Sequence, residues 1–339
     1  MDGIAKLSQK ERTELFDETA SRRENMSSLI IEKDFWVCWT LDKIFSHKSP
    51  SPNFIFKGGT TLSKVFNVIN RFSEDIDLSI LRDDLGFDGE KDVSAKMSSK
   101  QIKKRLDDIR SKCIVYINDS FLPVLRETFI SVLGDDSRWE LSVDESDPQT
   151  ILFAYPRDET PYMQDYVKPV IRLELGARSD HWPASEYEIK SYAAEEFPDY
   201  FTNLSCTIKT LEIERTFWEK ATILHAQYHR SEDSAIPDRF FRHYYDLALM
   251  IKAGIDESAM NNIALLHTVR EHKKLFYKSV WANYDTAVPG TLKLVPQEKR
   301  FSALKHDYRL MQQMIFSGAP SFEEIIEYLQ KFEDKINSF

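Results

Sequence analysis

The chain has 339 residues, enough for one large or two ordinary domains, and 42% of them are hydrophobic, which suffices for a core. No apolar run approaches the roughly 18 residues that a membrane span needs, and residues 1–6 lack the pattern of a signal peptide, so we expect a cytoplasmic protein with no membrane partner. The formal charge of −10 argues against a protein that coats nucleic acid nonspecifically, and three widely spaced cysteines fit neither a disulfide framework nor a zinc cluster.

Two helices are predicted near the N-terminus. The first covers residues 7–25, where Ser8 and Glu11 have the spacing of a capping box. The second begins at Ser27 or Ser28, and its apolar residues recur at helical intervals: Ile31, Phe35, Cys38, Leu41 and Phe45. We interpret this apolar face as core packing rather than as a ligand site.

The segment 54–80 has the pattern around which the rest of the chain is interpreted. It predicts a strand at 54–56, a turn at Gly58 and Gly59, a short helix, and a second strand at 75–80. Because side chains alternate along a strand, Asp75 and Asp77 are predicted to lie on one face of this second strand. The opposite face is apolar and consists of Ile76, Leu78 and Ile80.

These residue types suggest a metal and phosphate site. Two neighbouring carboxylates can share a hard cation, and Mg²⁺ prefers one or two of them together with phosphate oxygens and water. Gly58 and Gly59 allow the backbone to approach a ligand closely, and a helix that opens at Thr60 offers N–H groups to phosphate. The alternative for the two aspartates is a solvated or turn-capping pair at a strand end.

The middle of the chain predicts a loop at 82–90, a helical region at about 91–133 with a kink at Pro123, and then more strands. For the lysines and arginines at 96–112 we favour a solvated helix face over contacts to RNA phosphates. Alternating segments predict strands at 139–143, 150–155, 170–175 and 205–208, which would complete the sheet.

From residue 211 onward the chain is almost wholly helical, which divides it into domains at 1–210 and 211–339. Helices are predicted at 211–230, 238–253, 258–284 in pieces, 299–316 and 321–337. Lys220 falls within the apolar face of the first, where it either reaches solvent along its stem or meets a partner, because an unpaired buried charge is costly. A carboxylate or a phosphate can be that partner, and we favour the phosphate.

Two further features of this half allow more than one interpretation. His225 and His229 have the spacing of zinc ligands, but no third ligand is evident and we do not favour zinc. Residues 270–309 hold nine basic and four acidic residues with aromatic residues between them, a composition that suits the end of an RNA. The alternative is that these aromatic side chains face the core: Phe276, Tyr277, Trp281 and Tyr284.

The order of strand, Gly-Gly-Thr, short helix and Asp-x-Asp strand resembles the DNA polymerase β-like nucleotidyltransferases, and more closely the nucleotidyl transferase AbiEii/AbiGii toxin family of bacterial toxin–antitoxin and phage-defence systems. The resemblance spans about Ile31 to Phe316, with further matches at 31–37, 210–221, 242–247, 292–296 and 307–314. It implies an α+β fold, with a polymerase β-like mixed sheet and flanking helices followed by a helical C-terminal domain.

The resemblance also assigns a site residue by residue. Asp75 and Asp77 would hold Mg²⁺ or Mn²⁺, with Glu174 as the expected third carboxylate; Glu174 could equally be the ion-pair partner of Arg172. The residues that would position phosphates are Gly58, Gly59, Thr60, Ser73 and Lys220. Asp246 would complete the site from the helical half, and Arg242, one turn before it, could pair with it.

The implied activity is a metal-dependent nucleotidyltransferase that moves a nucleoside monophosphate from an NTP to an RNA acceptor such as the 3′ end of tRNA. The implied protein partner is a cognate antitoxin. Two other functions remain open: a nucleotide-binding interaction protein without turnover, and a glycosyltransferase that uses Asp-x-Asp with a sugar nucleotide. The glycosyltransferase fits poorly, because the glycine turn precedes the aspartates and no nucleoside-binding sheet precedes the turn.

Overall fold

The structure is a computed structural model that describes residues 1–23, 25–46, 53–135, 138–157 and 169–339. The chain divides into two compact units. Unit 1 comprises Met1–Val65, Phe72–Asp92 and Ser99–Thr210, and unit 2 comprises Phe66–Arg71, Val93–Ser98 and Leu211–Phe339. Nothing in the sequence assigns the short segments 66–71 and 93–98 to unit 2. No described helix is long and apolar enough to cross a membrane.

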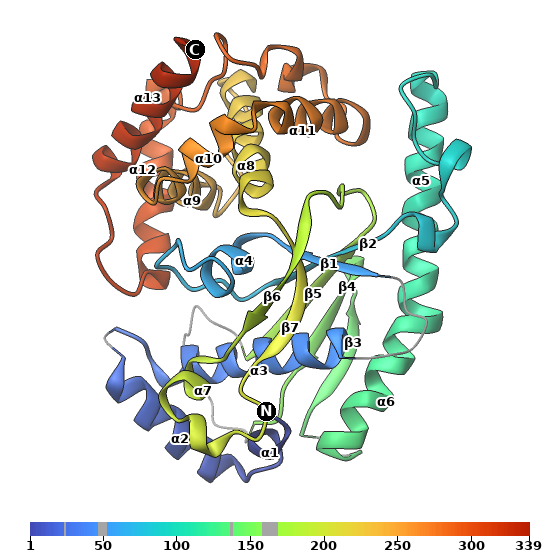
Figure 1. The fold of residues 1–339 in the computed structure, drawn as a ribbon, viewed down its shortest axis with the longest axis vertical. Coiled ribbons are helices and arrows are strands. Elements are labelled where there is room, and N and C mark those ends of the chain that lie inside the picture. Colours follow the sequence, from blue (N-terminus) through green and yellow to red (C-terminus); the bar gives the residue numbers. More distant parts are fainter. Residues whose placement is uncertain (24, 47–52, 136–137, 158–168) are drawn as a thin grey trace. The chain divides into compact units, whose positions relative to one another are not determined.

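Unit 1 is built on a mixed sheet of seven described strands in the order β3-β4-β5-β2-β1-β7-β6 (Figure 1). The strands are β1 Phe54–Lys57, β2 Ile76–Ile80, β3 Glu140–Asp144, β4 Asp147–Ala154, β5 Val170–Gly176, β6 Ala184–Ile189 and β7 Cys206–Leu211. β2 lies between β1, which is antiparallel to it, and β5, which is parallel to it. β4 is antiparallel to β3 and β5, and β7 is parallel to β1. The strand that carries Asp77 is therefore interior to the sheet.

The register around β2 separates polar from apolar rows. Lys57, Asp77 and Glu174 are neighbours across β1, β2 and β5. The adjacent row is apolar and consists of Phe56, Leu78 and Leu175. The predicted alternation therefore holds for Asp77. Asp75 precedes the strand, which begins at Ile76, so strand geometry does not set the direction of its side chain as we expected.

The helices of unit 1 include the two predicted at the N-terminus. They are α1 Asp2–Ala5, α2 Gln9–Arg22, α3 Ser28–Phe45, α4 Gly59–Lys64, α5 Ser99–Tyr116, α6 Leu122–Leu133 and α7 Tyr192–Glu196, with 3-10 turns at Asp83–Leu85, Gly89–Lys91 and Pro198–Tyr200. Ser8 and Glu11 form the predicted capping box of α2. The ring of Trp39 in α3 lies 4.6 Å from that of Phe129 in α6 and 6.0 Å from that of Phe153 in β4. The apolar face of α3 is therefore core, as we interpreted it.

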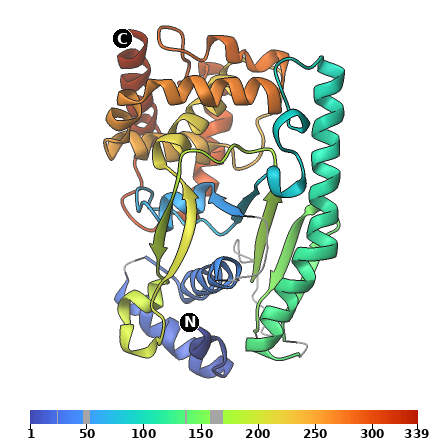
Figure 2. The ribbon, with the colours of Figure 1, turned by 45° about the vertical axis from the view of Figure 1, so that its right-hand side comes forward.

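α5 and α6 form one nearly continuous helix (Figures 1 and 2). A π-helical segment, Ile117–Phe121, joins them immediately before Leu122 and Pro123. Proline has no N–H to continue the helical ladder and its ring crowds the preceding turn, so the irregular segment accommodates it. The helix is thus interrupted near Pro123, as predicted, but the irregular segment lies just before the proline, at Ile117–Phe121.

Unit 2 is helical, as predicted. Its helices are α8 Ile213–His229, α9 Phe241–Lys252, α10 Ile255–Asn261, α11 Ile263–Phe276, α12 Phe301–Met311 and α13 Phe322–Asn337, with 3-10 turns at Val280–Ala282, Tyr284–Thr286, Glu298–Arg300 and Gln312–Met314. The core includes ring contacts between Phe217 and Phe332 at 5.1 Å and between Phe241 and Tyr308 at 4.7 Å. The segment 66–71 joins this unit through a β-bridge between Arg71 and Ile315.

The predicted fold class is confirmed: a mixed sheet with flanking helices, followed by helices, makes this an α+β protein. β6 and α7 were not predicted. β6 has the sequence Ala-Ser-Glu-Tyr-Glu-Ile at one end of the strand order and is largely accessible to solvent, so it lacks the apolar alternation that reveals a half-buried strand.

Candidate active site

The glycine turn lies directly against the carboxylate of Asp77. Gly58 has φ +87° and ψ −161°, a conformation that residues with a side chain rarely adopt. A Cβ at Gly58 would lie 2.0 Å from Asp77 Oδ2 and 2.9 Å from Asp77 Cγ. Glycine is therefore required at this position for two separate reasons: the backbone conformation, and the space that the Asp77 side chain occupies.

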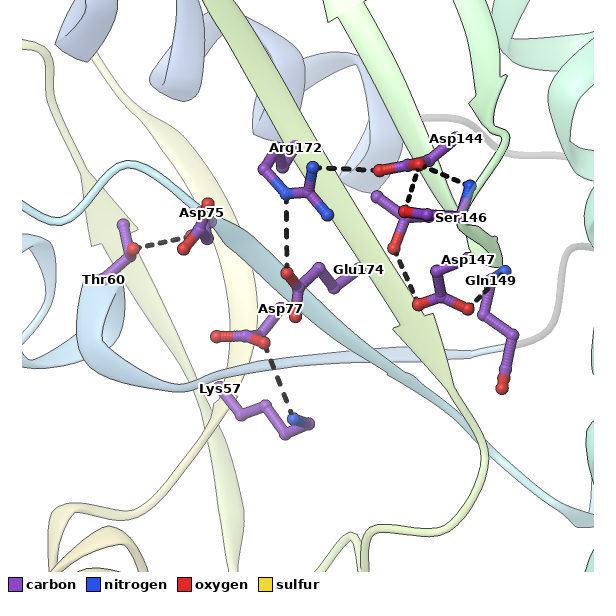
Figure 3. A network of polar contacts seen from close by, with 11 residues as sticks. Lys57, Thr60, Asp75, Asp77, Asp144, Ser146, Asp147, Gln149, Arg172 and Glu174 are labelled. Carbon is purple, nitrogen blue, oxygen red and sulfur yellow. Dashed lines mark hydrogen bonds and ion pairs between the residues drawn. The ribbon is translucent and has the colours of Figure 1, made fainter. Parts of the chain in front are cut away.

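Asp77 is part of a polar row that crosses three strands (Figure 3). Its register neighbours are Lys57 on β1 and Glu174 on β5, and Figure 3 shows the three side chains near one another. Lys57 Nζ is 3.9 Å from Asp77 Oδ1, a long separation for a charged hydrogen bond. Partial removal of Glu174 from water, followed by the negative charges of Asp77 and Asp75, raises the pKa of Glu174. The carboxylates thus repel one another, which favours a bound cation or proton here.

Asp75 is held by its backbone rather than by the strand. Thr60 Oγ1 donates a hydrogen bond of 2.6 Å to the carbonyl oxygen of Asp75 and lies 3.0 Å from Ser73 Oγ (Figure 3). Thr60 is 1% exposed, whereas Ser73, Asp75 and Asp77 are half-buried. The side chain of Thr60 is therefore engaged within the segment that carries the aspartates, so its predicted contact to phosphate is left to its backbone N–H.

Two alternative roles are predicted for Glu174: a metal ligand and the ion-pair partner of Arg172. Arg172 Nε is 3.7 Å from Glu174 Oε1, while Arg172 Nη1 makes a shorter ion pair of 3.0 Å to Asp144 Oδ2 (Figure 3). The preferred partner of Arg172 is thus Asp144, which leaves Glu174 only weakly paired. Among the residues that the structure describes, no three or more His, Cys, Asp and Glu side chains converge closely enough to hold a metal ion by themselves.

Lys220 and Asp246 meet within unit 2. Lys220 Nζ donates a hydrogen bond of 2.7 Å to Asp246 Oδ2. Arg71 binds both oxygens of the same carboxylate, through Nε at 2.7 Å and Nη2 at 2.8 Å. Asp246 is 0% exposed. Burial by itself would raise the pKa of Asp246, but Arg71 and Lys220 outweigh it and hold this pKa below its ordinary value.

The triad of Lys220, Asp246 and Arg71 shows which side chain pairs with Lys220 in the apolar face of α8. Its partner is the Asp246 carboxylate, which it shares with Arg71. Two cations on one carboxylate leave a net positive charge, and the phosphate contact that we favour for Lys220 stays a prediction. The arginine that pairs with Asp246 is Arg71 rather than Arg242. No local pattern predicts this pair, because Arg71 and Asp246 are 175 residues apart. The assignment of Lys220 and Asp246 to catalysis stays a prediction.

His225 is engaged by the backbone at both ring nitrogens. Its Nδ1 accepts a hydrogen bond of 3.1 Å from Lys293 N, so the proton of the neutral ring lies on Nε2, which donates to the carbonyl oxygen of Asn283 at 3.1 Å. Burial lowers the pKa of His225 to about 4. These contacts define a neutral structural histidine whose nitrogens are committed to the loops that cover α8.

The basic segment 270–309 is less positive than its own composition indicates. Several of its lysines pair with acidic residues from other parts of the chain: Lys293 with Glu333, Lys299 with Glu232 and Lys305 with Glu323. Some of its aromatic residues face the core and others are accessible to a base of an RNA. Phe276 is buried, while Tyr277 and Trp281 are 42% and 46% exposed, and the guanidinium of Arg230 lies 5.5 Å from the Trp281 ring.

A glycine turn packed against an Asp-x-Asp carboxylate in an α+β fold is the arrangement that we expect of a nucleotidyltransferase. The chain belongs to the nucleotidyl transferase AbiEii toxin family of type IV toxin–antitoxin systems, whose model matches residues 39–335. None of the curated proteins matches the chain. Among solved structures, it is similar to MenT4, the nucleotidyltransferase toxin Rv2826c from Mycobacterium tuberculosis H37Rv, with 14% identity over 96% of this chain and 98% of that one and a TM-score of 0.44.

Proposed function

We propose that this toxin-family nucleotidyltransferase transfers a nucleoside monophosphate from an NTP to an RNA hydroxyl, such as the 3′ end of tRNA, with the help of Mg²⁺ or Mn²⁺. The observation that carries the proposal is the packing of the Asp77 carboxylate against the backbone of Gly58, with Glu174 beside it in register. The turn and the acidic side chains thus form one site, which suits a triphosphate and its cation. Family membership supports the reaction type.

Asp75 and Asp77 would hold the divalent ion, and Glu174 is the candidate for a third ligand. The donor set fits, because Mg²⁺ commonly takes one or two protein carboxylates and completes its shell with phosphate oxygens and water. The raised pKa of Glu174 supports this, since burial raises it first and the negative charges of Asp77 and Asp75 add to the rise. When bound, the ion would stabilise the negative charge that develops on the transferred phosphate.

In the proposed reaction the RNA hydroxyl oxygen attacks the α-phosphorus, the bond from this phosphorus to the bridging oxygen breaks, and pyrophosphate leaves. Gly58, Gly59, Thr60 and Ser73 are the candidates for orienting the phosphates. Gly58 and Gly59 contribute backbone that no side chain shields. Lys220 and Asp246 are assigned to the reaction by the family resemblance alone, and their ion pair with Arg71 gives them a structural role as well.

Exposed aromatic rings and the family membership bear on the RNA acceptor and the antitoxin. The exposed rings of Tyr277 and Trp281 support an RNA acceptor, because unpaired bases stack on aromatic side chains. The description of the family as part of a toxin–antitoxin system supports a cognate antitoxin. The ion pairs that neutralise Lys293, Lys299 and Lys305 argue that stacking contributes more to binding here than charge does.

The test is a transfer assay with purified protein, each labelled NTP in turn, total tRNA and Mg²⁺. We expect label in RNA together with an equivalent release of pyrophosphate. Asp75→Ala and the isosteric Asp77→Asn should each abolish both. Asp88→Asn is the matched control, because Asp88 is an exposed carboxylate of the same unit with no part in the site.

Each other outcome has a definite meaning. Label transfer that survives in Asp75→Ala refutes the assignment of the site. Pyrophosphate release without labelled RNA points to a different acceptor. A nucleotide that binds and is recovered intact, with no pyrophosphate, identifies a nucleotide-binding interaction protein without turnover.

A further inference from the structure

Three consecutive charged residues of α3 lie inside unit 1, where charged side chains are rare. Glu32, Lys33 and Asp34 are 5%, 2% and 2% exposed. Burying charges costs several kcal/mol for each ion unless a well-placed partner compensates, so each side chain needs a specific contact. Removing one partner is correspondingly damaging. The partners of Lys33 and Asp34 belong to the two segments that form the candidate active site.

Lys33 reaches the segment that carries the aspartates. Its Nζ lies 2.6 Å from Glu74 Oε2, and the Glu74 side chain is only 13% exposed. Glu74 is the residue before Asp75, and Asp75 lies outside β2. The sheet ladder therefore does not fix Asp75, whereas the ion pair to α3 fixes the residue beside it.

Asp34 reaches the other segment. Its Oδ1 lies 2.7 Å from Lys64 Nζ, and its Oδ2 accepts a hydrogen bond of 2.7 Å from the backbone N–H of Tyr192 at the start of α7. Lys64 is the last residue of α4, the short helix that follows the glycine turn. Lys64 and Asp34 are 5% and 2% exposed, so this ion pair is buried as well.

These contacts close a ring. α3 holds Glu74 through Lys33 and holds α4 through Asp34, and Thr60 in α4 donates its hydrogen bond to the carbonyl oxygen of Asp75. The glycine turn and the Asp75 segment are thus attached to each other and to one rigid helix. A loop that is restrained at several points keeps a side chain in one geometry, which is what a site for a cation and a triphosphate needs.

We propose that Lys33 and its neighbour Asp34 are positioning residues for the nucleotidyl transfer site: Lys33 sets Asp75 through Glu74, and Asp34 sets the glycine turn through Lys64. This inference rests on the proposed function for its catalytic readout. Residues that orient the groups around a reaction centre change rates by about 10- to 100-fold when they are removed.

Glu32 supplies a matched control. It is the neighbouring residue on the same helix and is equally buried, but its charged partner is Arg157 at 3.6 Å, which follows β4 and has no contact with the glycine turn or with Glu74 among the described interactions. Glu32→Gln replaces this carboxylate by a neutral side chain of nearly the same size and shape. It removes a buried charge from α3 and leaves the ring intact.

The experiment compares Lys33→Met, Glu74→Gln, the double variant and Glu32→Gln. Hydrogen–deuterium exchange of the peptides that cover 58–64 and 72–77 is the readout that does not depend on activity. We expect faster exchange in both peptides for Lys33→Met and Glu74→Gln, and wild-type exchange for Glu32→Gln. For transfer, we expect kcat to fall about 10- to 100-fold and the Mg²⁺ requirement to rise, with the KM for RNA unchanged.

The double variant separates positioning from general damage. If the ion pair acts as a unit, the double variant loses no more activity than Lys33→Met does, because the interaction is already absent. The proposal is overturned if folded Lys33→Met and Glu74→Gln exchange like wild type, or if they lose activity only in proportion to their unfolded fraction, as Glu32→Gln would. A wild-type protein without any transfer activity refutes the proposed function instead, and the exchange comparison still decides whether Lys33 orders the segment 72–77.

Discussion

Replacing Gly58 by alanine tests the meeting of the glycine turn and Asp77, and its effect can be worked out from the structure. The backbone at φ +87° and ψ −161° costs a residue with a Cβ about 1–3 kcal/mol. The new Cβ would also lie 2.0 Å from Asp77 Oδ2, so the turn or the carboxylate must move by about 1 Å or more to reach an ordinary contact. A displacement of this size costs about 100-fold in turnover when it affects a reacting group.

Gly134 is a matched control for the backbone contribution. It has φ +78° and ψ +167°, close to the conformation of Gly58, but a Cβ there would meet nothing within 4 Å among the residues that the structure describes. Gly134→Ala should therefore lower the free energy of unfolding by about 1–3 kcal/mol, which equals the backbone contribution expected for Gly58→Ala. It should not change kcat. Chemical denaturation measures the first quantity and the labelled-NTP assay the second.

The contact with Asp77 can be isolated further. In an Asp77→Ala background the closest atoms are gone, so Gly58→Ala should cost less free energy of unfolding there than in the wild type. If Gly58→Ala keeps wild-type turnover, or if both glycine variants lose equal activity, the idea that the turn and the carboxylate form one site is wrong.

Two further predictions concern unit 2. Arg71→Met leaves the buried Asp246 with one cation fewer and should lower the free energy of unfolding by about 3–5 kcal/mol. Lys299→Met is the control: it removes an ion pair whose lysine is 76% exposed, so it should change the free energy of unfolding by less than about 1 kcal/mol. Equal denaturation midpoints for the two variants would contradict the role of the triad. His225 has a folded-state pKa of about 4 against about 6.5 when unfolded, so the unfolded state binds the proton first as the pH falls. Its contribution, up to about 3 kcal/mol, is fully present above about pH 6.5 and is lost between about pH 6.5 and 4; an NMR titration that places this histidine near 6.5 would refute the assignment.

The local patterns of the sequence were sufficient for most of the elements. The capping box at Ser8, the alternation around Asp77 and the interruption near Pro123 are decided by residues a few positions apart, and each is found in the structure. β6 was missed because an accessible strand at the end of a sheet needs no apolar alternation. The alternation of polar and apolar residues predicts a strand that includes Asp75, whereas β2 begins one residue later, at Ile76.

The partners of the buried charges could not be predicted in the same way. Periodicity places Lys220 within an apolar face but does not identify its partner, and it gives no sign that Lys33 and Asp34 are buried. Which carboxylate or cation meets them depends on how helices distant in sequence pack. Glu74 is 41 residues from Lys33, and Asp246 is 175 residues from Arg71.

The amino-acid order alone therefore established a glycine turn followed by Asp75 and Asp77 and the helical second half, because these follow from steric rules and side-chain periods that act over a few residues. The α+β class came from the family resemblance. The fold in three dimensions determined that Gly58 touches Asp77, that Glu174 lies beside it, and that Lys220 and Arg71 share the carboxylate of Asp246. Electrostatic pairing acts through space, so the residues that hold a charged group in place become known only when the packed chain brings them together.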